Sequence, residues 1–345
     1  MKASHEEIIA AVLKKAEDRF PGELELLGIY GSAATGDLHE RSDLDLLIVT
    51  SERSAPVLSE AFILDDEQVG YDIYCTSWQM LEEDAECRHA NLGKLMDSGI
   101  VYSRDEAASE RLESLRRKAA GILASDERYS RAGDIMHQVL VQYALAMAAG
   151  GISERRGHAA YMISLCLSAV MISGGRYFRM GVKRTFEEIE GVPLPERFRE
   201  TIYRIIGCRD DADMEKPLTE LLRIMLAFTK RTEERPAPTR EDLAGTYEEM
   251  VSNWSGKMEE AAQRNDVFSS FMNMASLQFM FREVSERMAV MEYDALGRFD
   301  PDDLEGNAGR FGDALKEYLE EYEKAGLEPA RYADARSFAE HYLNS

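Results

Sequence analysis

Two aspartates separated by one residue, Asp43 and Asp45, stand at the start of the apolar run 46–49. Side chains alternate between the two faces of a strand, so both carboxylates point the same way, roughly 7 Å apart along the chain. Carboxylate oxygens at this spacing suit a hard divalent cation. Uncompensated charges at the mouth of so apolar a strand are costly to desolvate, so we expect a cation partner there.

The pair alone is a weak signal, because a chain with 64 acidic residues contains such spacings by chance about a dozen times. A glycine-serine turn ahead of the two aspartates strengthens the prediction of a binding site. The apolar run 26–30 stops at Gly31, where glycine permits a sharp turn, and Ser32 follows. Backbone amides after such a turn, with a hydroxyl beside them, can cradle phosphate oxygens. The polar segment between the two strands offers three further candidates for phosphate contact, with an ordinary polar loop as the alternative: Thr35, Arg41 and Ser42.

A third carboxylate lies in another apolar strand. Two apolar stretches, residues 62–64 and 69–75, flank the polar turn 65–68. This pattern predicts a hairpin of two strands. Asp72 lies between Tyr71 and Ile73 in the second arm and faces opposite to them. We expect Asp72 to lie beside Asp43 and Asp45, close enough to share a metal.

The wider pattern predicts an α+β protein. A helix over 4–20 precedes the strands, helices follow near 77–81 and 92–96, and a last short strand covers 99–102. Strand signals then stop, and helical periods dominate over 132–149, 159–173, 218–228, 241–262, 266–293 and 311–325. The polar, proline-bearing stretch 230–238 is typical of a linker. We therefore predict an N-terminal domain over 1–105 with a small mixed sheet and flanking helices, an all-helical bundle over 106–235, and a C-terminal helical extension over 236–345.

Composition limits the classes of partner. The chain has 345 residues, 45% of them apolar and 30% charged, with four scattered cysteines and no CxxC pair. It shows no apolar run long enough for a bilayer and no signal-peptide core, so we expect a cytoplasmic protein with no membrane partner. The net charge of −23 argues against nucleic acid and is compatible with a cationic small molecule. A homodimer is compatible with the sequence.

The combined pattern resembles the nucleotidyltransferase superfamily, which includes DNA polymerase β and the aminoglycoside (kanamycin-type) and lincosamide nucleotidyltransferases. The family pattern is an apolar residue, Gly-Ser, a spacer, Asp-apolar-Asp-apolar, and a third acidic residue on a later strand. The matching segments here are Tyr30-Gly31-Ser32, Asp43-Leu44-Asp45-Leu46 and Asp72. The resemblance covers about the first 105 residues and is much looser for the helices.

The resemblance implies an adenylyltransferase-like enzyme that moves a nucleoside monophosphate from an NTP, with ATP expected, to a hydroxyl of a small molecule. Pyrophosphate would leave, and the closest model acceptor is an antibiotic of the aminoglycoside or lincosamide kind. Two Mg²⁺ ions held by Asp43, Asp45 and Asp72 would neutralise the triphosphate and lower the pKa of the attacking hydroxyl. Two alternatives stay open: a protein-AMPylating, antitoxin-type enzyme, and a non-catalytic regulatory or binding module of the same fold.

The helical part adds only single candidates. In antibiotic-modifying relatives a helical domain closes over the nucleotide, and the resemblance makes Lys183 the candidate that reaches the triphosphate. Such relatives also supply a general base from this domain, but residues 135–149 contain no acidic residue and only Asp134 precedes them. The base is therefore left open between Asp72 and a carboxylate such as Glu187 or Glu188.

Overall fold

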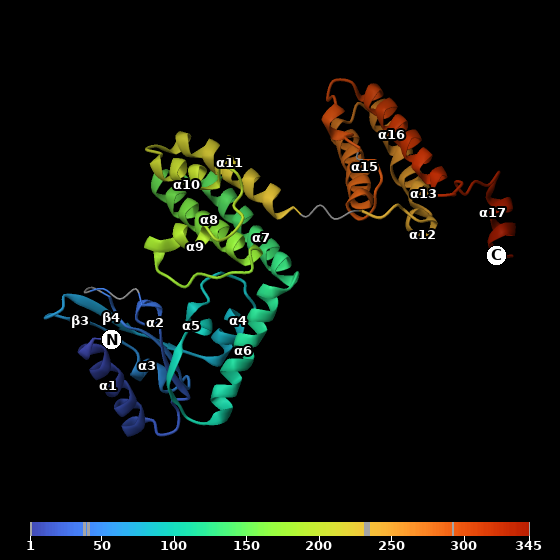
Figure 1. The fold of residues 1–345 in the computed structure, drawn as a ribbon. Coiled ribbons are helices and arrows are strands. Elements are labelled where there is room, and N and C mark those ends of the chain that lie inside the picture. Colours follow the sequence, from blue (N-terminus) through green and yellow to red (C-terminus); the bar gives the residue numbers. More distant parts are fainter. Residues whose placement is uncertain (1, 37–38, 40–41, 231–234, 292, 345) are drawn as a thin grey trace. The chain divides into compact units, whose positions relative to one another are not determined.

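The computed structural model of the chain describes residues 2–36, 39, 42–230, 235–291 and 293–344 (Figure 1). The chain divides into two compact units, residues 1–231 and residues 232–345. Each unit has a hydrophobic core of its own. In the described part of the chain, no helix combines the length and the apolar character that crossing a bilayer requires.

A four-stranded mixed sheet organises the N-terminal part of the first unit. Its strands are β1 (Leu26–Tyr30), β2 (Asp45–Val49), β5 (Cys75–Thr76) and β6 (Gly99–Ser103), in the spatial order β5-β2-β1-β6. β1 is antiparallel to β2 and β6, whereas β5 runs parallel to β2. β3 (Glu60–Leu64) and β4 (Val69–Ile73) pair as a separate hairpin that contains Asp72. The predicted strands over 26–30, 46–49 and 99–102 and the predicted hairpin are confirmed, but the second arm of the hairpin ends at Ile73 rather than at 75, because Cys75 pairs with β2 in the four-stranded sheet.

The two faces of the sheet are buried against different layers. One face packs against α1 (Ala3–Arg19), whose buried residues recur at helical spacing: Ile9, Val12 and Ala16. The other face joins a core shared with the helices that follow the sheet, through Leu26, Leu47 and Val49. Asp45 lies on the same face of β2 as Leu47 and Val49, because side chains alternate along a strand. Its carboxylate is thus directed to the helical side of the sheet.

Helices complete the first unit. The short ones are α2 (Ser32–Thr35), α3 (Ala55–Leu58), α4 (Trp78–Asp84) and α5 (Gly93–Met96). The later ones are α6 (Glu106–Ala124), α7 (Glu127–Ala148), α8 (Ile152–Ser173), the 3₁₀ turn η1 (Val182–Arg184), α9 (Thr185–Ile189), α10 (Phe198–Gly207) and α11 (Asp211–Thr229). In Figure 1, α6 runs alongside the sheet and α7 continues into the layer formed by α8 to α11. Their shared core joins the sheet to the helical layer.

Three of these helices begin earlier than the sequence predicts. α7 starts at Glu127 rather than at 132, α8 at Ile152 rather than at 159, and α11 at Asp211 rather than at 218. Asp210 caps α11 by accepting a hydrogen bond from the Asp213 amide. The helix includes Pro217, which removes one backbone donor, but Pro217 and its neighbour Leu218 are both buried and their packing holds the segment helical.

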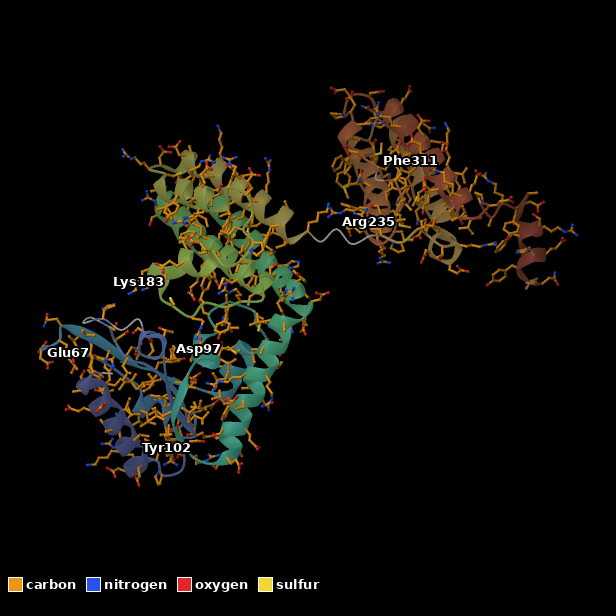
Figure 2. The ribbon with its side chains drawn as sticks, in the orientation of Figure 1. Glu67, Asp97, Tyr102, Lys183, Arg235 and Phe311 are labelled. Atoms are coloured by element: carbon orange, nitrogen blue, oxygen red, sulfur yellow. The ribbon has the colours of Figure 1, made fainter. Side chains whose placement is uncertain are left out.

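The second unit is entirely helical in its described part. It contains α12 (Arg240–Leu243), α13 (Thr246–Met250), the π-helical turn η2 (Val251–Ser255), α14 (Gly256–Gln263), α15 (Val267–Arg287), the 3₁₀ turn η3 (Leu296–Arg298), α16 (Leu304–Lys324) and α17 (Ala335–Tyr342). Its core is rich in methionine and aromatic side chains and includes Phe311 of α16, labelled in Figure 2.

The single helix predicted over 241–262 is wrong. Gly245 interrupts it with a φ of 84°, a left-handed conformation that glycine adopts without steric cost. The helix predicted over 266–293 ends at Arg287, because Met288 is extended and its side chain is buried in the core.

The α+β class predicted from the sequence is confirmed. The predicted boundary at residue 105 lies inside the first unit, between β6 and α6, where the two sides share one core. The predicted boundary at residue 235 lies close to the division between the two units.

Candidate active site

A cavity of about 800 Å³ lies within the first unit, between the sheet and the segment that connects α8 to α9. The strand side contributes the end of β1, the turn after it and the start of β2: Tyr30, Gly31, Ser32, Asp43 and Asp45. The connecting segment contributes Phe178, Arg179, Met180, Gly181 and Lys183. Residues far apart in the sequence, and predicted separately as candidates, therefore line one cavity.

Asp43 and Asp45 lie on this cavity at the start of β2. Asp43 is exposed just before the strand, Leu44 between them is buried, and Asp45 is half-buried as the first strand residue. Burial, and then the negative charge of Asp43, raise the pKa of the Asp45 carboxyl to about 6, although a hydrogen bond from the Ser32 amide acts in the opposite direction. The site thus holds two neighbouring carboxylates whose mutual repulsion a cation would relieve.

The turn after β1 is built around these carboxylates. Gly31 has a φ of 66°, and a Cβ added to it would overlap the Asp45 side chain. A glycine is therefore required here for two reasons, the backbone conformation and the space that the carboxylate fills. This close approach positions the amide of Ser32 against Asp45.

The side chains of the turn differ in what they already bind. The Ser32 hydroxyl oxygen is buried and has no hydrogen-bond partner in the described part of the chain. A buried hydroxyl without a partner is unfavourable, so this atom suits a ligand that brings an acceptor. Thr35 also lines the cavity, but its hydroxyl donates to the Gly31 carbonyl at 3.0 Å. Ser32 is therefore the better placed of the two for phosphate contact.

Asp72 lies on β4 and does not line the cavity. It is exposed on the strand face opposite buried Tyr71, the face that it shares with Gly70, which does line the cavity. Its charge contributes to raising the pKa of Tyr30 to about 12, after burial and the charges of Asp45, Asp43 and Asp84. Asp72 thus acts on the same region electrostatically.

The described residues contain no group of three His, Cys, Asp or Glu side chains close enough to hold a metal ion by themselves. Asp72 does not complete a three-carboxylate cluster with the pair in this structure, and its role as a ligand stays a prediction. Magnesium at nucleotide sites is commonly bound by one or two carboxylates together with substrate phosphates. Asp43 and Asp45 beside the Gly31 turn fit that manner of binding.

The remaining predicted residues are distributed unevenly. Ser42 is buried on the cavity wall, where its hydroxyl accepts a hydrogen bond from the His39 amide at 3.0 Å. Lys183 lines the cavity from η1. Arg41 lies outside the residues that the structure describes.

The two helical carboxylates considered as general bases are engaged elsewhere. Glu187 pairs with Arg184 at 2.9 Å, and Glu188 accepts the backbone amides of Arg179 and Met180 at 2.8 and 3.1 Å. Neither lines the cavity.

Three residues that line the cavity were not predicted from the sequence. Asp84 at the end of α4 pairs with His89 Nε2 at 3.2 Å and with Lys94 Nζ at 3.4 Å, and all three line the cavity. Asp84 is largely buried, so it holds two basic side chains at the wall with little solvent screening. No local motif marks this group. Only its cluster of a carboxylate and two bases within eleven residues, 84–94, could have drawn attention to it.

Comparisons with known proteins bear on the N-terminal part of the chain. Residues 9–89 match the family model described as a nucleotidyltransferase domain, a range that contains the Gly31 turn and all three predicted aspartates. A comparison with curated proteins finds no match. Among solved structures, a nucleotidyltransferase-like protein from Exiguobacterium sibiricum 255-15 matches with 13% identity and a TM-score of 0.37, over 75% of this chain and 91% of that one. The match supports a nucleotidyltransferase domain at residues 9–89 and, with it, nucleotidyl transfer as a general function that uses an NTP and a divalent metal.

Proposed function

We propose that the protein transfers a nucleoside monophosphate from an NTP to a hydroxyl of a small molecule and releases pyrophosphate. The observation that carries the proposal is a single cavity lined by the Gly31-Ser32 turn, the Asp43 and Asp45 carboxylates, and the basic side chains of Arg179 and Lys183. A triphosphate bound with its metal needs carboxylates on one side and hydrogen-bond donors or cations on the other.

The metal-binding part of the proposal assigns Asp43 and Asp45 to Mg²⁺. Their two carboxylates would bind the metal together with triphosphate oxygens, which would neutralise charge and activate the attacking hydroxyl. We also propose that the site binds two Mg²⁺ ions. Asp72 would serve either as a third metal ligand or as the group that accepts the hydroxyl proton. Asp72 is exposed, which leaves its carboxylate accessible for either role.

We propose that the triphosphate binds between the Gly31-Ser32 turn and the basic side chains of Arg179 and Lys183. The Ser32 hydroxyl, which has no partner among the described residues, would donate to a phosphate oxygen, and Lys183 would approach from η1. ATP is the proposed NTP. Ser42, Thr35 and Arg41 are proposed to support the same end of the nucleotide.

A small acceptor is favoured by the size of the cavity and by charge. A volume of about 800 Å³ lies within the usual range for small-molecule sites. The net charge of −23 disfavours a nucleic-acid acceptor and favours a cationic compound. A compound of the aminoglycoside or lincosamide kind is the model for the first acceptor panel.

The first test measures binding of an NTP, with and without Mg²⁺, by calorimetry on the full chain. Wild type should bind ATP with Mg²⁺ at least tenfold more tightly than with EDTA. Asp43→Asn should lose most of this metal dependence, whereas Asp18→Asn, which changes an exposed carboxylate on α1, should keep it. Equal binding with and without metal, or an unchanged response in Asp43→Asn, would contradict the assignment.

A further inference from the structure

The segment between α8 and α9 forms one wall of the cavity without regular structure of its own. Residues 176–181 follow the end of α8 and precede η1, and four of them line the cavity: Phe178, Arg179, Met180 and Gly181. A segment without intrahelical hydrogen bonds must be positioned by its other contacts. Those contacts decide where Arg179 and Lys183 stand relative to the carboxylates.

Asp97, at the end of α5, makes the most concentrated set of these contacts. Its Oδ1 accepts a hydrogen bond from the Tyr177 hydroxyl at 3.0 Å and pairs with Arg179 Nη2 at 3.0 Å. Its Oδ2 accepts from Arg179 Nε at 3.2 Å, so the arginine binds the carboxylate with two nitrogens. Two parallel charge-assisted bonds fix the direction of the guanidinium as well as its distance. Figure 2 labels Asp97 beside α5 and Lys183 at the edge of the helical layer.

Two further sets of hydrogen bonds hold the same segment. The Phe178 amide donates to the Ala90 carbonyl at 2.7 Å, which ties the segment to the loop between α4 and α5. The next two amides, of Arg179 and Met180, donate to Glu188 on the helical side. The segment is therefore held from both sides by hydrogen bonds to its backbone amides. Asp97 adds the contacts to its side chains, Tyr177 and Arg179.

The two partners differ in burial, with the Asp97 side chain 13% exposed and the Arg179 side chain 56% exposed. The two-nitrogen geometry and the added Tyr177 bond, rather than burial of the pair, therefore distinguish this contact from an ordinary surface ion pair. Asp97 itself does not line the cavity, whereas Arg179 does. Any effect of Asp97 on a bound nucleotide must therefore pass through Arg179 and the segment that carries it.

We propose that Asp97 is a positioning residue that latches the 176–181 segment over the nucleotide cavity and thereby sets the affinity for the NTP. The proposal rests on the proposed function for the identity of the ligand. The latch itself concerns only contacts between residues of this chain. It follows that breaking the Asp97–Arg179 pair loosens the segment and weakens nucleotide binding, without changing the groups that hold the metal.

The test compares Asp97→Asn with Glu86→Gln in the full chain. Glu86 also links the strand side to the helical layer, through Arg131 at 2.9 Å and through Lys118, but it does not touch the 176–181 segment or the cavity. It is therefore a matched control for a general loss of contact between the halves. Tyr177→Phe, which removes only one hydroxyl, serves as the second, milder latch variant.

Two readouts are needed. Hydrogen–deuterium exchange of the peptide containing Phe178, Arg179 and Met180 should become about tenfold faster in Asp97→Asn and less so in Tyr177→Phe, with no change in Glu86→Gln. The dissociation constant for Mg·ATP should rise about tenfold in Asp97→Asn and stay within twofold in Glu86→Gln. In a double-mutant cycle, Asp97→Asn should add little once Arg179→Gln is present.

The outcomes separate the latch from the proposed function. Unchanged exchange in both latch variants, or faster exchange with an unchanged dissociation constant for Mg·ATP, would overturn the latch. A wild type that binds no NTP at all would overturn the proposed function, while the exchange measurement would still report whether Asp97 holds the segment.

Discussion

The Asp45 carboxylate fills the space in which a side chain at Gly31 would begin. The contact follows from the register of the sheet, which pairs Tyr30 at the end of β1 with Asp45 at the start of β2. The chain turns directly after Tyr30, so the residue that follows must lie against the Asp45 side chain. The turn proposed for phosphate and the carboxylate proposed for metal are thus parts of one packed arrangement.

Gly31→Ala should disturb both parts at once. The substitution forces a Cβ into the Asp45 carboxylate and places a non-glycine residue at a φ of 66° and a ψ of −146°, a region that is essentially restricted to glycine, which alone costs about 1–3 kcal/mol. We expect a loss of more than about 2 kcal/mol in the free energy of unfolding and a loss of Mg·ATP binding. Urea denaturation and calorimetry would measure these effects.

Gly22→Ala is the matched control for this prediction. Gly22 has a φ of 80° but open space where a Cβ would lie, so its substitution should cost about 1 kcal/mol and leave nucleotide binding intact. An equal, small effect of both substitutions would show that the contact with Asp45 is unimportant.

Asp45→Asn should stabilise the metal-free protein. Burial and the charge of Asp43 raise the pKa of Asp45 to about 6, so at pH 7.5 the folded state carries an ionised carboxylate that lowers the free energy of unfolding. A neutral amide removes that destabilisation and can still accept the hydrogen bond from the Ser32 amide. In EDTA the variant should therefore unfold at higher urea than wild type, and added Mg·ATP should stabilise only wild type. A variant less stable than wild type in EDTA would contradict the account.

Ser32→Ala should separate stability from binding. The Ser32 hydroxyl is buried without a partner among the described residues, so its removal should leave the free energy of unfolding unchanged or slightly higher. If the hydroxyl donates to a phosphate, the dissociation constant for Mg·ATP should rise about tenfold, as expected for a hydrogen bond to a charged group worth about 1.5 kcal/mol. A lower stability with unchanged affinity would assign Ser32 to the fold instead.

Glu67 provides a prediction for pH. Its carboxylate accepts hydrogen bonds from Lys2 Nζ at 3.0 Å and the Tyr71 hydroxyl at 2.9 Å, and hydrogen bonds from Ser4, Lys2 and Tyr71 lower its pKa to about 2. Because the folded-state pKa lies below the ordinary value of 4.5, the stabilisation is complete above pH 4.5 and is lost as the pH falls toward 2. Wild type should therefore have a higher melting temperature than Glu67→Gln at pH 7, and the difference in melting temperature should become smaller below pH 4.5. A difference that is constant with pH would rule out the ionised carboxylate as its source.

Much of the strand side of the cavity was predictable because its signals are local. The alternation around Asp43, Asp45 and Asp72, and the glycine before Ser32, follow from periods of two and from turn chemistry within a few residues. The structure places those strands and that turn where the pattern predicts them. The failure at Gly245 was also local in origin, because apolar spacing continued across a glycine that adopts a left-handed conformation.

The other wall of the cavity could not be derived in this way. Asp84, His89 and Lys94 come from α4, α5 and the loop between them, and Arg179 lines the cavity while it is paired with Asp97, eighty-two positions earlier. No periodicity encodes such contacts between distant segments. Lys183 was found only because a family resemblance pointed to the helical part.

The central claim is best tested by measuring transfer itself. The full chain, Mg²⁺ and ATP or GTP are incubated with a panel of hydroxylated acceptors that includes aminoglycosides and lincosamides, and products are weighed by mass spectrometry while pyrophosphate is assayed. The account predicts that at least one small acceptor gains a nucleoside monophosphate, with equal pyrophosphate release, and that Asp43→Asn abolishes both while its thermal unfolding stays cooperative. Transfer that persists at the wild-type rate in Asp43→Asn would contradict the assignment of the metal site, and transfer to protein alone would contradict the small-molecule acceptor.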